Sequence, residues 1–267
     1  AFMIWTTTPW TLPANMAIAV GGELSYVLVR FGGSLTVVAE GRLEALSEVC
    51  GVDDVEILGK CVGADLVGLT YEHPFCSRTG TLLQADHVTL EDGTGLVHTA
   101  PGHGTEDYIV GLAAGMDIYC PVLENGTYDQ SVPDWLQGLS VWDANEKVVE
   151  HLRQSGHLVH HVAYTHSYPH DWRSKTPVIF RSTEQWFVAV DADFGGGESL
   201  RNRGLTAIDQ DVSFGPDWGR KRMRGMVESR PDWCLSRQRA GGLPIPAFFM
   251  PDGSMLLTAS TVRAVAE

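Results

Sequence analysis

The stretch "IWTTTPWTLPAN" at residues 4–15 places three threonine hydroxyls in a row directly after an apolar run. Thr6, Thr7 and Thr8 are flanked by Trp5 and Trp10, and prolines follow them. The high strand propensity of threonine would account for this run. A site that positions a water molecule or an ester would also account for it, because each hydroxyl can donate and accept a hydrogen bond. Both interpretations stay open from this stretch alone.

A second stretch, "GTGLVHTAPGHGTEDY" at residues 93–108, combines a glycine-rich loop with an acidic residue. Gly95 allows tight turning and close approach of the backbone. Thr105 is expected to be the N-cap of a short helix, which puts Asp107 in the first turn. There Asp107 would stabilise the helix dipole by about 0.3–1 kcal/mol. Alternatively, its carboxylate would bind the ammonium group of a ligand.

Histidines occur in two places that could carry chemistry. His98 falls on an expected strand and His103 in the loop after it, so both could share a pocket with Asp107. A buried, hydrogen-bonded histidine is the ordinary alternative for His98. The segment "HVAYTHSYPH" spaces three further histidines as a metal site could use them, but cysteine is absent there and no carboxylate completes a recognisable zinc site. These three are His161, His166 and His170.

Composition excludes several classes of protein. The 267 residues are 44% hydrophobic with a net charge of −14, which indicates a globular chain and argues against a broad nucleic-acid surface. Five cysteines without a C-x-x-C pair favour a reducing compartment, so we expect a cytoplasmic protein. No apolar stretch reaches the roughly 18 residues of a membrane span, and no signal peptide is visible. Because residue 1 is Ala and residues 2–6 resemble a strand, we expect a piece of a longer protein.

The first hundred residues are expected to form mostly short strands. This pattern predicts a mixed, mainly β fold, in which a small closed β-barrel carries peripheral α-helices. The expected strands cover residues 17–20, 26–30, 35–39, 55–58, 81–84 and 87–90, with a hairpin over 87–99. Helices are expected over 42–50 and from an Asp143/Glu146 cap pattern to Gln154, and the glycine-rich residues 191–205 are expected to be a mobile linker.

Four motifs, in order along nearly the whole chain, resemble the editing domain of isoleucyl-tRNA synthetase, which is inserted in a class I catalytic fold. The first two are "TTTPWTLPAN" and "GTGLVHTAPGHGTEDY". The others, "SYPHDWRSKTPVIFRSTEQWF" and "RPDWCLSRQR", are similar to the segments that lead back into the catalytic domain. The resemblance implies an editing domain over 1–165, a helical and irregular return segment over 166–220, and a partial start of the second catalytic half over 221–267.

The resemblance further implies hydrolysis of valyl-tRNA mischarged on the isoleucine tRNA, and possible hydrolysis of valyl-adenylate. A missing methylene gives only about 1–3 kcal/mol of discrimination, and this enzyme class is itself the usual example of that limit, so a second site is needed. By position, Asp107 would bind the α-amino group, His98 would set the pocket size, and Trp10 would form a wall. The three threonines would orient the ester or the attacking water, and Gly95 and His103 would complete the substrate site.

An aminoacyl ester is already activated, so positioning and donor groups can supply most of the rate. No catalytic triad signature such as G-x-S-x-G is present, and no general base is assigned. We expect no metal or organic cofactor for editing, with ATP and Mg²⁺ needed only for aminoacylation by the parent enzyme. The expected partner is the aminoacylated 3′ end of tRNA(Ile), with its valine moiety, bound to a monomer and not to a membrane. The basic residues after 220 are candidate contacts to the tRNA backbone.

The sequence departs from the family in two respects. Gly241 stands where the family has a tryptophan shortly after "SRQR", and the two ATP-binding signatures of the family are absent. The chain is therefore expected to edit but not to aminoacylate. Two rival functions stay open: a module that binds the aminoacyl end without hydrolysis, and a metal-dependent hydrolase built on His161, His166 and His170.

Overall fold

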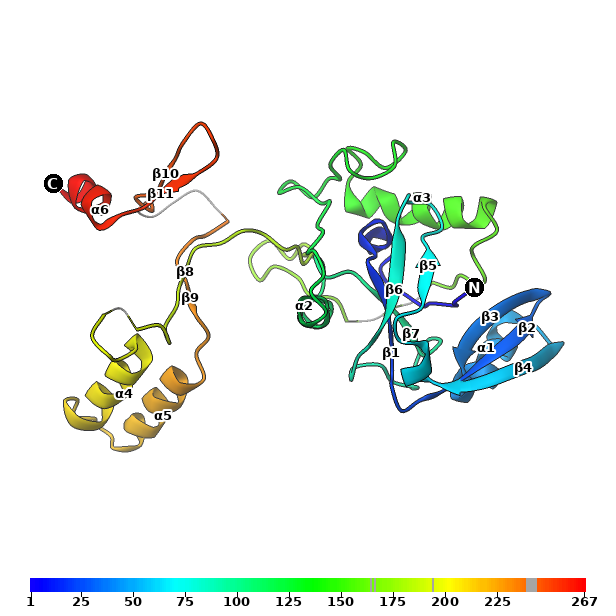
Figure 1. The fold of residues 1–267 in the computed structure, drawn as a ribbon, viewed down its shortest axis with the longest axis horizontal. Helices are drawn as coiled ribbons and strands as arrows, with labels where there is room; N and C mark the ends of the chain where they lie inside the picture. Colours follow the sequence, from blue (N-terminus) through cyan, green and yellow to red (C-terminus); the bar gives the residue numbers. More distant parts are fainter. Residues whose placement is uncertain (164, 166, 194, 239–243) are drawn as a thin grey trace. The chain divides into compact units, whose positions relative to one another are not determined.

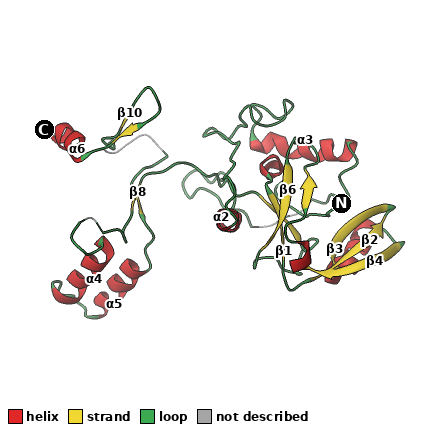
Figure 2. Ribbon diagram, viewed as in Figure 1, coloured by secondary structure: helices red, strands yellow, loops and turns green. Residues whose placement is uncertain are grey.

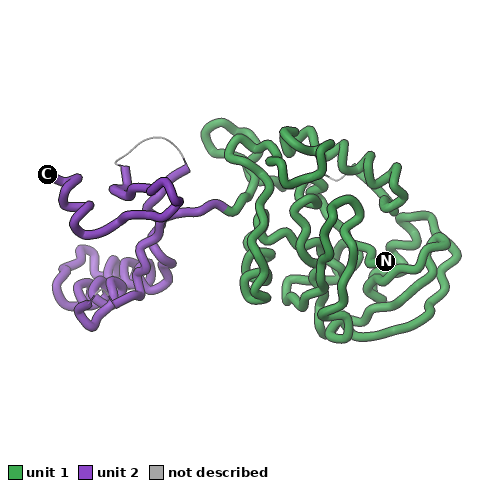
Figure 3. The backbone as a smooth tube through the Cα atoms, turned by 45° about the horizontal axis from the view of Figure 1, so that its top comes forward, with its two compact units in different colours: residues 1–182 green, residues 183–267 purple. Residues whose placement is uncertain are grey.

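The computed structural model divides into two compact units, unit 1 over Ala1–Ser182 and unit 2 over Thr183–Glu267 (Figures 1 and 3). The domain boundaries predicted near residues 165 and 220 stay predictions, because compactness alone does not locate a functional boundary. The structure describes residues 1–163, 165, 167–193, 195–238 and 244–267.

Unit 1 is a mixed α/β body whose strands lie in two sheets (Figure 2). Its elements are η1 (Pro9–Ala14), β1 (Ala17–Val20), β2 (Ser25–Phe31), β3 (Ser34–Ala39), η2 (Glu40–Arg42), α1 (Leu43–Cys50), β4 (Val55–Val62), η3 (Gly63–Leu66), β5 (Thr70–Glu72), β6 (Thr79–Gln84), β7 (Leu96–Thr99), α2 (Thr105–Ala113) and α3 (Val141–Gln154).

The four-stranded sheet has the order β5-β6-β1-β7, and the three-stranded sheet has the order β3-β2-β4. β1 pairs parallel with β6 and antiparallel with β7. The N-terminal segment lies between the two sheets, because Phe2 bridges Val37 of β3 and Trp5 bridges Val97 of β7. The predicted closed barrel is not found among the described strands, where these single bridges take the place of continuous pairing.

The core of unit 1 follows from apolar runs in the sequence. All four residues of β1 are buried, as expected for a strand covered on both faces. Beside η1, the α3 residues Val141, Ala144 and Val148 are fully buried at helical spacing and share a cluster with Trp10. Burying each such large aliphatic side chain contributes about 1.5–3 kcal/mol. This packing fixes η1, which carries part of the threonine motif, against α3.

The predicted strand over 87–90 and the hairpin over 87–99 are wrong. β7 forms as expected, but it pairs with β1, while residues 87–90 form no strand. The Arg42 guanidinium accounts for the difference, because it donates to the carbonyl oxygens of Leu90, Glu91 and Gly93 at 3.1, 3.1 and 2.9 Å. Hydrogen bonds from the Arg42 side chain thus take the place of the backbone hydrogen bonds that a hairpin would form.

The helices form where they were predicted, but two caps differ. Helix α2 begins at Thr105 itself, so its N-cap is Gly104 and not Thr105. The N-cap of α3 is Ser140, whose hydroxyl accepts from the Asp143 backbone N at 3.2 Å. Helix α1 ends at Gly51 in the left-handed conformation, with φ 64°, as expected for a glycine cap.

The described part of unit 2 contains three helices and two pairs of short strands. Its elements are β8 (Phe187–Val188), α4 (Leu200–Gln210), α5 (Trp218–Glu228), β9 (Trp233–Cys234), β10 (Phe248–Phe249), β11 (Met255–Leu256) and α6 (Ala259–Ala266). The linker predicted over 191–205 is wrong in its second half, because the Ser199 hydroxyl caps α4 there by accepting from Asn202 N at 3.2 Å. Gly241 lies outside the described residues. None of the described helices combines the length and the apolarity that crossing a bilayer requires.

Candidate functional site

The threonine segment leaves the sheet at the Trp5–Val97 bridge and enters η1 with Thr8 as its N-cap residue. Thr8 N donates to Thr6 Oγ1 at 3.0 Å, and the two hydroxyl oxygens lie 3.4 Å apart. Thr6 and Thr8 are half-buried and Thr7 is exposed. The three hydroxyls therefore lie at a surface and not within a continuous strand.

A hydrogen-bonded chain leads inward from Thr8 to His98 of β7. The Thr11 hydroxyl donates to Thr8 O at 2.8 Å and lies 3.3 Å from Thr8 Oγ1 and 2.9 Å from His98 Nε2. A hydroxyl has one proton, and that of Thr11 goes to Thr8 O. Thr11 must therefore accept from the other two groups, so His98 Nε2 carries a proton and donates.

The other ring nitrogen of His98 is also engaged. Asn15 Nδ2 lies 2.8 Å from His98 Nδ1 and 2.9 Å from Ala17 O, so this amide donates to both. Tyr71 donates its hydroxyl proton to Asn15 Oδ1. Burial, together with smaller contributions from the charges of His73 and His103, lowers the pKa of His98 to about 3. His98 is thus a neutral imidazole in a fixed tautomer, and neither nitrogen is available to take a proton from water.

Asp107 lies in the first turn of α2 and folds back over the loop before it. Ala100 N donates to its Oδ2 at 2.8 Å, and a Cβ built on Gly104 would come within 3.3 Å of that carboxyl group. Burial raises the pKa of Asp107, while the bond from Ala100 opposes the shift. Among the described residues no lysine, arginine or histidine forms an ion pair with this half-buried carboxylate.

His103 lies against Trp10, with ring centroids 5.0 Å apart and the ring planes at 77°. Its Nδ1 lies 2.9 Å from Phe180 O, which can only accept, so Nδ1 carries the proton. Nε2 is therefore an unprotonated acceptor, and it is buried without a hydrogen-bond partner among the described residues. Burial lowers the pKa of His103 as well. The backbone N of His103 donates to Ala100 O at 2.8 Å, so His103 and Asp107 are both anchored on Ala100.

The structure thus brings predicted residues together in three groups: Thr6 and Thr8 with His98, Trp10 with His103, and Asp107 of α2 with His103 through Ala100. Gly95 stands apart at the far end of β7 from Ala100. A Cβ there would lie 2.3 Å from the Cβ of Ala39, and the Gly95 carbonyl accepts from the Tyr26 hydroxyl at 2.7 Å. Packing alone accounts for this glycine, and its substrate role stays a prediction.

Sequence reasoning missed Thr11 and Asn15, which hold both nitrogens of His98. It also missed His73 and Arg78, which hold the end of η1. His73 Nε2 donates to Leu12 O at 2.9 Å, and Arg78 Nη1 donates to Asn15 O at 2.8 Å. All four connect the threonine motif to strands and loops distant in sequence.

The buried histidines predict a specific pH dependence of stability. The pKa values of His98 and His73 fall to about 3 and about 4, because burial disfavours the imidazolium ion. Between about pH 6.5 and about 4 the unfolded chain binds protons that the folded chain does not bind. The free energy of unfolding should therefore decrease as the pH falls through this window, by up to about 1.4 kcal/mol per pH unit for each histidine. Urea unfolding at several pH values measures this slope, and the slope should become shallower in His98→Phe.

No three His, Cys, Asp or Glu side chains gather to hold a metal ion within the described ranges. His161 and His170 lie in those ranges, but His166 lies outside them. The predicted histidine cluster therefore stays a prediction.

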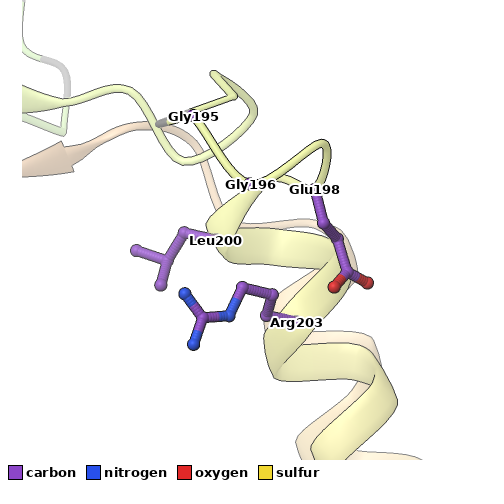
Figure 4. A pocket seen from close by; sticks show the side chains of 5 residues that line it. All are labelled: Gly195, Gly196, Glu198, Leu200 and Arg203. Atoms are coloured by element: carbon purple, nitrogen blue, oxygen red, sulfur yellow. The ribbon is translucent and has the colours of Figure 1, made fainter.

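A surface depression in unit 2 is lined by Gly195, Gly196, Glu198, Leu200 and Arg203 (Figure 4). Asp193 shapes this loop, since its Oδ1 accepts from the backbone N of Gly195, Gly196 and Gly197 at 2.8–3.0 Å. None of the predicted site residues lines the depression, so it is separate from the candidate site.

The family model of class I tRNA synthetases (I, L, M and V) matches residues 19–267. The chain belongs to this family. Similar curated proteins include the isoleucine–tRNA ligase of Nitratidesulfovibrio vulgaris (strain DP4), 48% identical over 99% of the chain, and that of Geobacter sulfurreducens, 47% identical over 100%. The chain spans 28% of the length of each of these class I synthetases.

Solved structures show only a weak likeness. A structure described as GlLeuRS-CP1 has a TM-score of 0.49 and 15% identity, covering 62% of this chain and 84% of its own. The editing domain of the Plasmodium falciparum cytosolic leucyl-tRNA synthetase has a TM-score of 0.45 and 14% identity, covering 58% and 77%. Likeness at this level carries no argument, so the family membership rests on sequence.

Proposed function

We propose that this chain is the editing module of an isoleucyl-tRNA synthetase and hydrolyses the ester bond of valyl-tRNA(Ile). The observation that supports this most is the half-buried carboxylate of Asp107, which forms no salt bridge among the described residues; only the charge of His87 acts on it to lower its pKa. A carboxylate in such a place is stabilised by an ammonium ion. The α-amino group of an aminoacyl ester supplies one.

The threonine chain would position the ester or the attacking water. The Thr11 proton is committed to Thr8 O, and His98 donates to Thr11, so the orientation of the inner hydroxyls is fixed. Thr6 forms the outer end of this chain and Thr7 is exposed beside it, where a substrate could be reached. Pre-oriented groups of this kind lower the barrier without a protein nucleophile, because the ester is already activated.

The side-chain pocket would be formed by His98 and Trp10, with His103 beside them. His98 would exclude isoleucine by its volume, and Trp10 would form a rigid wall because η1 and α3 hold it in the core. The Nε2 of His103, which has no hydrogen-bond partner among the described residues, would accept a hydrogen bond from the substrate ammonium group or from a bound water. We propose no metal or organic cofactor for this reaction.

The proposed partner is the aminoacylated 3′ end of tRNA(Ile), bound by a monomer in the cytoplasm. Several of the basic residues in unit 2 are already engaged. Arg220 donates to Asp209 O at 2.9 Å, Arg224 pairs with Asp209 and Glu228, Arg201 pairs with Asp191, and Arg237 donates to Cys234 O at 2.9 Å. Lys221 and Arg222 on α5 are exposed and stay candidates for contacts with the tRNA backbone.

Release of labelled valine from valyl-tRNA(Ile) by the full chain tests this function. We expect release above the spontaneous rate, unchanged by EDTA. Loss of the activity with EDTA would favour the metal-dependent hydrolase. Tight binding of valyl-tRNA(Ile) without release would favour the module that only binds.

A further inference from the structure

Residues 168–178 of unit 1 form a short hairpin. His170 and Pro177 form a bridge, Val178 N donates to Pro169 O at 3.1 Å, and Asp171 N donates to Thr176 O at 2.9 Å. We call this segment the Trp172 hairpin. It follows α3 in the chain, and neither the threonine chain nor Asp107 uses it.

The tip of the Trp172 hairpin is held in one conformation. Asp171 Oδ1 accepts from the backbone N of Arg173 and Ser174 at 3.1 and 2.7 Å, and Lys175 N donates to Asp171 O at 2.9 Å. Lys175 has φ 60°, the one left-handed residue other than glycine in the described part of the chain. Glycine or asparagine would adopt this conformation more easily. A lysine held there points to a use for its ammonium group.

Aromatic side chains recur along this segment. Tyr168 and His170 alternate along the extended arm, which places them on the same side, and Trp172 lies in the turn at the tip. The Tyr168 ring contacts those of Trp142 and His170 at centroid distances of 6.2 and 6.3 Å. Trp172 is 71% exposed, and the Arg173 guanidinium lies 4.5 Å from its ring centroid. Since so much of Trp172 is accessible, the ring face away from Arg173 is open to solvent.

The charge around the hairpin is opposite to that of the rest of unit 1. Residues 1–182 contain 9 lysines and arginines against 22 acidic residues. Residues 151–182 contain four of these cations and one carboxylate, that of Asp171, which the turn already engages. Arg153 pairs with Glu150 and Arg181 donates to Val122 O, which leaves Arg173 and Lys175. Among the described residues neither Arg173 nor Lys175 forms an ion pair. Two cations and an open indole on an otherwise acidic unit match a flexible polyanion that carries bases.

The hairpin is also tied to the candidate site. Beyond it, Phe180 O accepts from His103, and Ser182 N donates to Gly102 O at 2.7 Å. The five residues from Lys175 to Phe180 span at most about 17 Å. A stacked strand advances about 3.4 Å per nucleotide, so this distance corresponds to about five nucleotides.

We propose that the Trp172 hairpin binds the single-stranded 3′ end of an RNA, with a base stacked on Trp172 and phosphates at Arg173 and Lys175. The inference rests on the proposed function, because the terminal nucleotide of that strand would carry the ester into the site. It also extends that function, since the motifs that predicted editing assign no binding role to this hairpin.

Fluorescence anisotropy with a labelled ten-nucleotide single-stranded RNA, of the acceptor 3′-end sequence and without an amino acid, tests the proposal on the full chain. Trp172→Ala should weaken binding about tenfold, the effect of losing one base–aromatic stack. Lys175→Gly removes the ammonium group at a φ that glycine favours, and it should reduce the slope of log K against log salt by about 0.7. Phe249→Ala is the matched control, because Phe249 is 73% exposed in unit 2, and it should bind as the original chain does.

Binding that stays within twofold in both hairpin variants, or no binding by the original chain, would overturn the proposal. Because the probe has no ester, this result is independent of hydrolysis. Hairpin-dependent binding without valine release would reject only the proposed function. Valine release that is insensitive to both hairpin variants, together with unchanged RNA binding, would reject only the role of the hairpin.

Discussion

Replacing Asp107 with Asn is expected to lower kcat/KM for hydrolysis of valyl-tRNA(Ile) by about 30- to 1,000-fold. Removing one partner of a partly buried charge pair raises the free energy of the bound state by about 2–4 kcal/mol, which corresponds to this loss in kcat/KM. In the original chain, Ala100 N donates a hydrogen bond to the Asp107 carboxylate at 2.8 Å. The side-chain oxygen of asparagine can accept the same hydrogen bond. The loop before α2 should therefore keep its conformation, and the loss should come from the missing charge alone.

Valine release and thermal unfolding, measured on the same preparation, separate the two roles of Asp107. If the carboxylate only stabilises the start of α2, Asp107→Asn would leave hydrolysis unchanged and lower stability by a few tenths of a kcal/mol. Glu106→Gln is the matched control, because Glu106 is exposed in the same helical turn, and it should leave the hydrolysis rate unaffected. An Asp107→Asn variant as active as the original chain would reject the ammonium-binding role.

Replacing His98 with Ala and with Phe should give different results. His98→Ala removes the volume of the ring and leaves Thr11 and Asn15 without their partner, so we expect a loss of about 2–4 kcal/mol of stability. The space gained should admit isoleucine, and hydrolysis of isoleucyl-tRNA(Ile) should come within about tenfold of that of valyl-tRNA(Ile). His98→Phe keeps the bulk but loses both hydrogen bonds.

The Phe variant separates size exclusion from positioning. If the ring gates the pocket by volume, His98→Phe should still spare isoleucyl-tRNA(Ile). If His98 acts only by orienting Thr11, both variants should lose valine release to a similar extent and neither should attack the isoleucyl ester. Hydrolysis of both esters by both variants can be followed by release of the labelled amino acid. Isoleucyl-tRNA(Ile) spared by His98→Ala would contradict the size gate.

Local sequence patterns predicted most elements of unit 1 because their causes are local. The buried run of β1 and the glycine that ends α1 need only neighbouring residues to be recognised. The predicted hairpin over 87–99 was wrong because the competing hydrogen-bond donor is distant in sequence. Arg42 lies 48 to 51 residues before the carbonyl oxygens to which it donates. The local sequence at residues 87–90 does not indicate that a distant arginine side chain donates to this segment.

The candidate site was predicted in its outline but not in its inner contacts. Thr8 and Thr11 are three residues apart, and in a 3-10 helix residues i and i+3 lie on the same side. Recognising η1 as a 3-10 helix would have added Thr11 to the site. Asn15 had no such signal, because its role depends on His98, which is 83 residues away. The open face of Trp172 and the left-handed Lys175 likewise become visible only in three dimensions.

Selective removal of valine from tRNA(Ile), with isoleucine spared, is the activity that we propose for this chain. Its most direct test is the parallel deacylation of valyl-tRNA(Ile) and isoleucyl-tRNA(Ile) by the full 267-residue chain. We expect rapid loss of valine, with isoleucine lost no faster than in buffer. Loss of both amino acids at similar rates, or of neither, would contradict it.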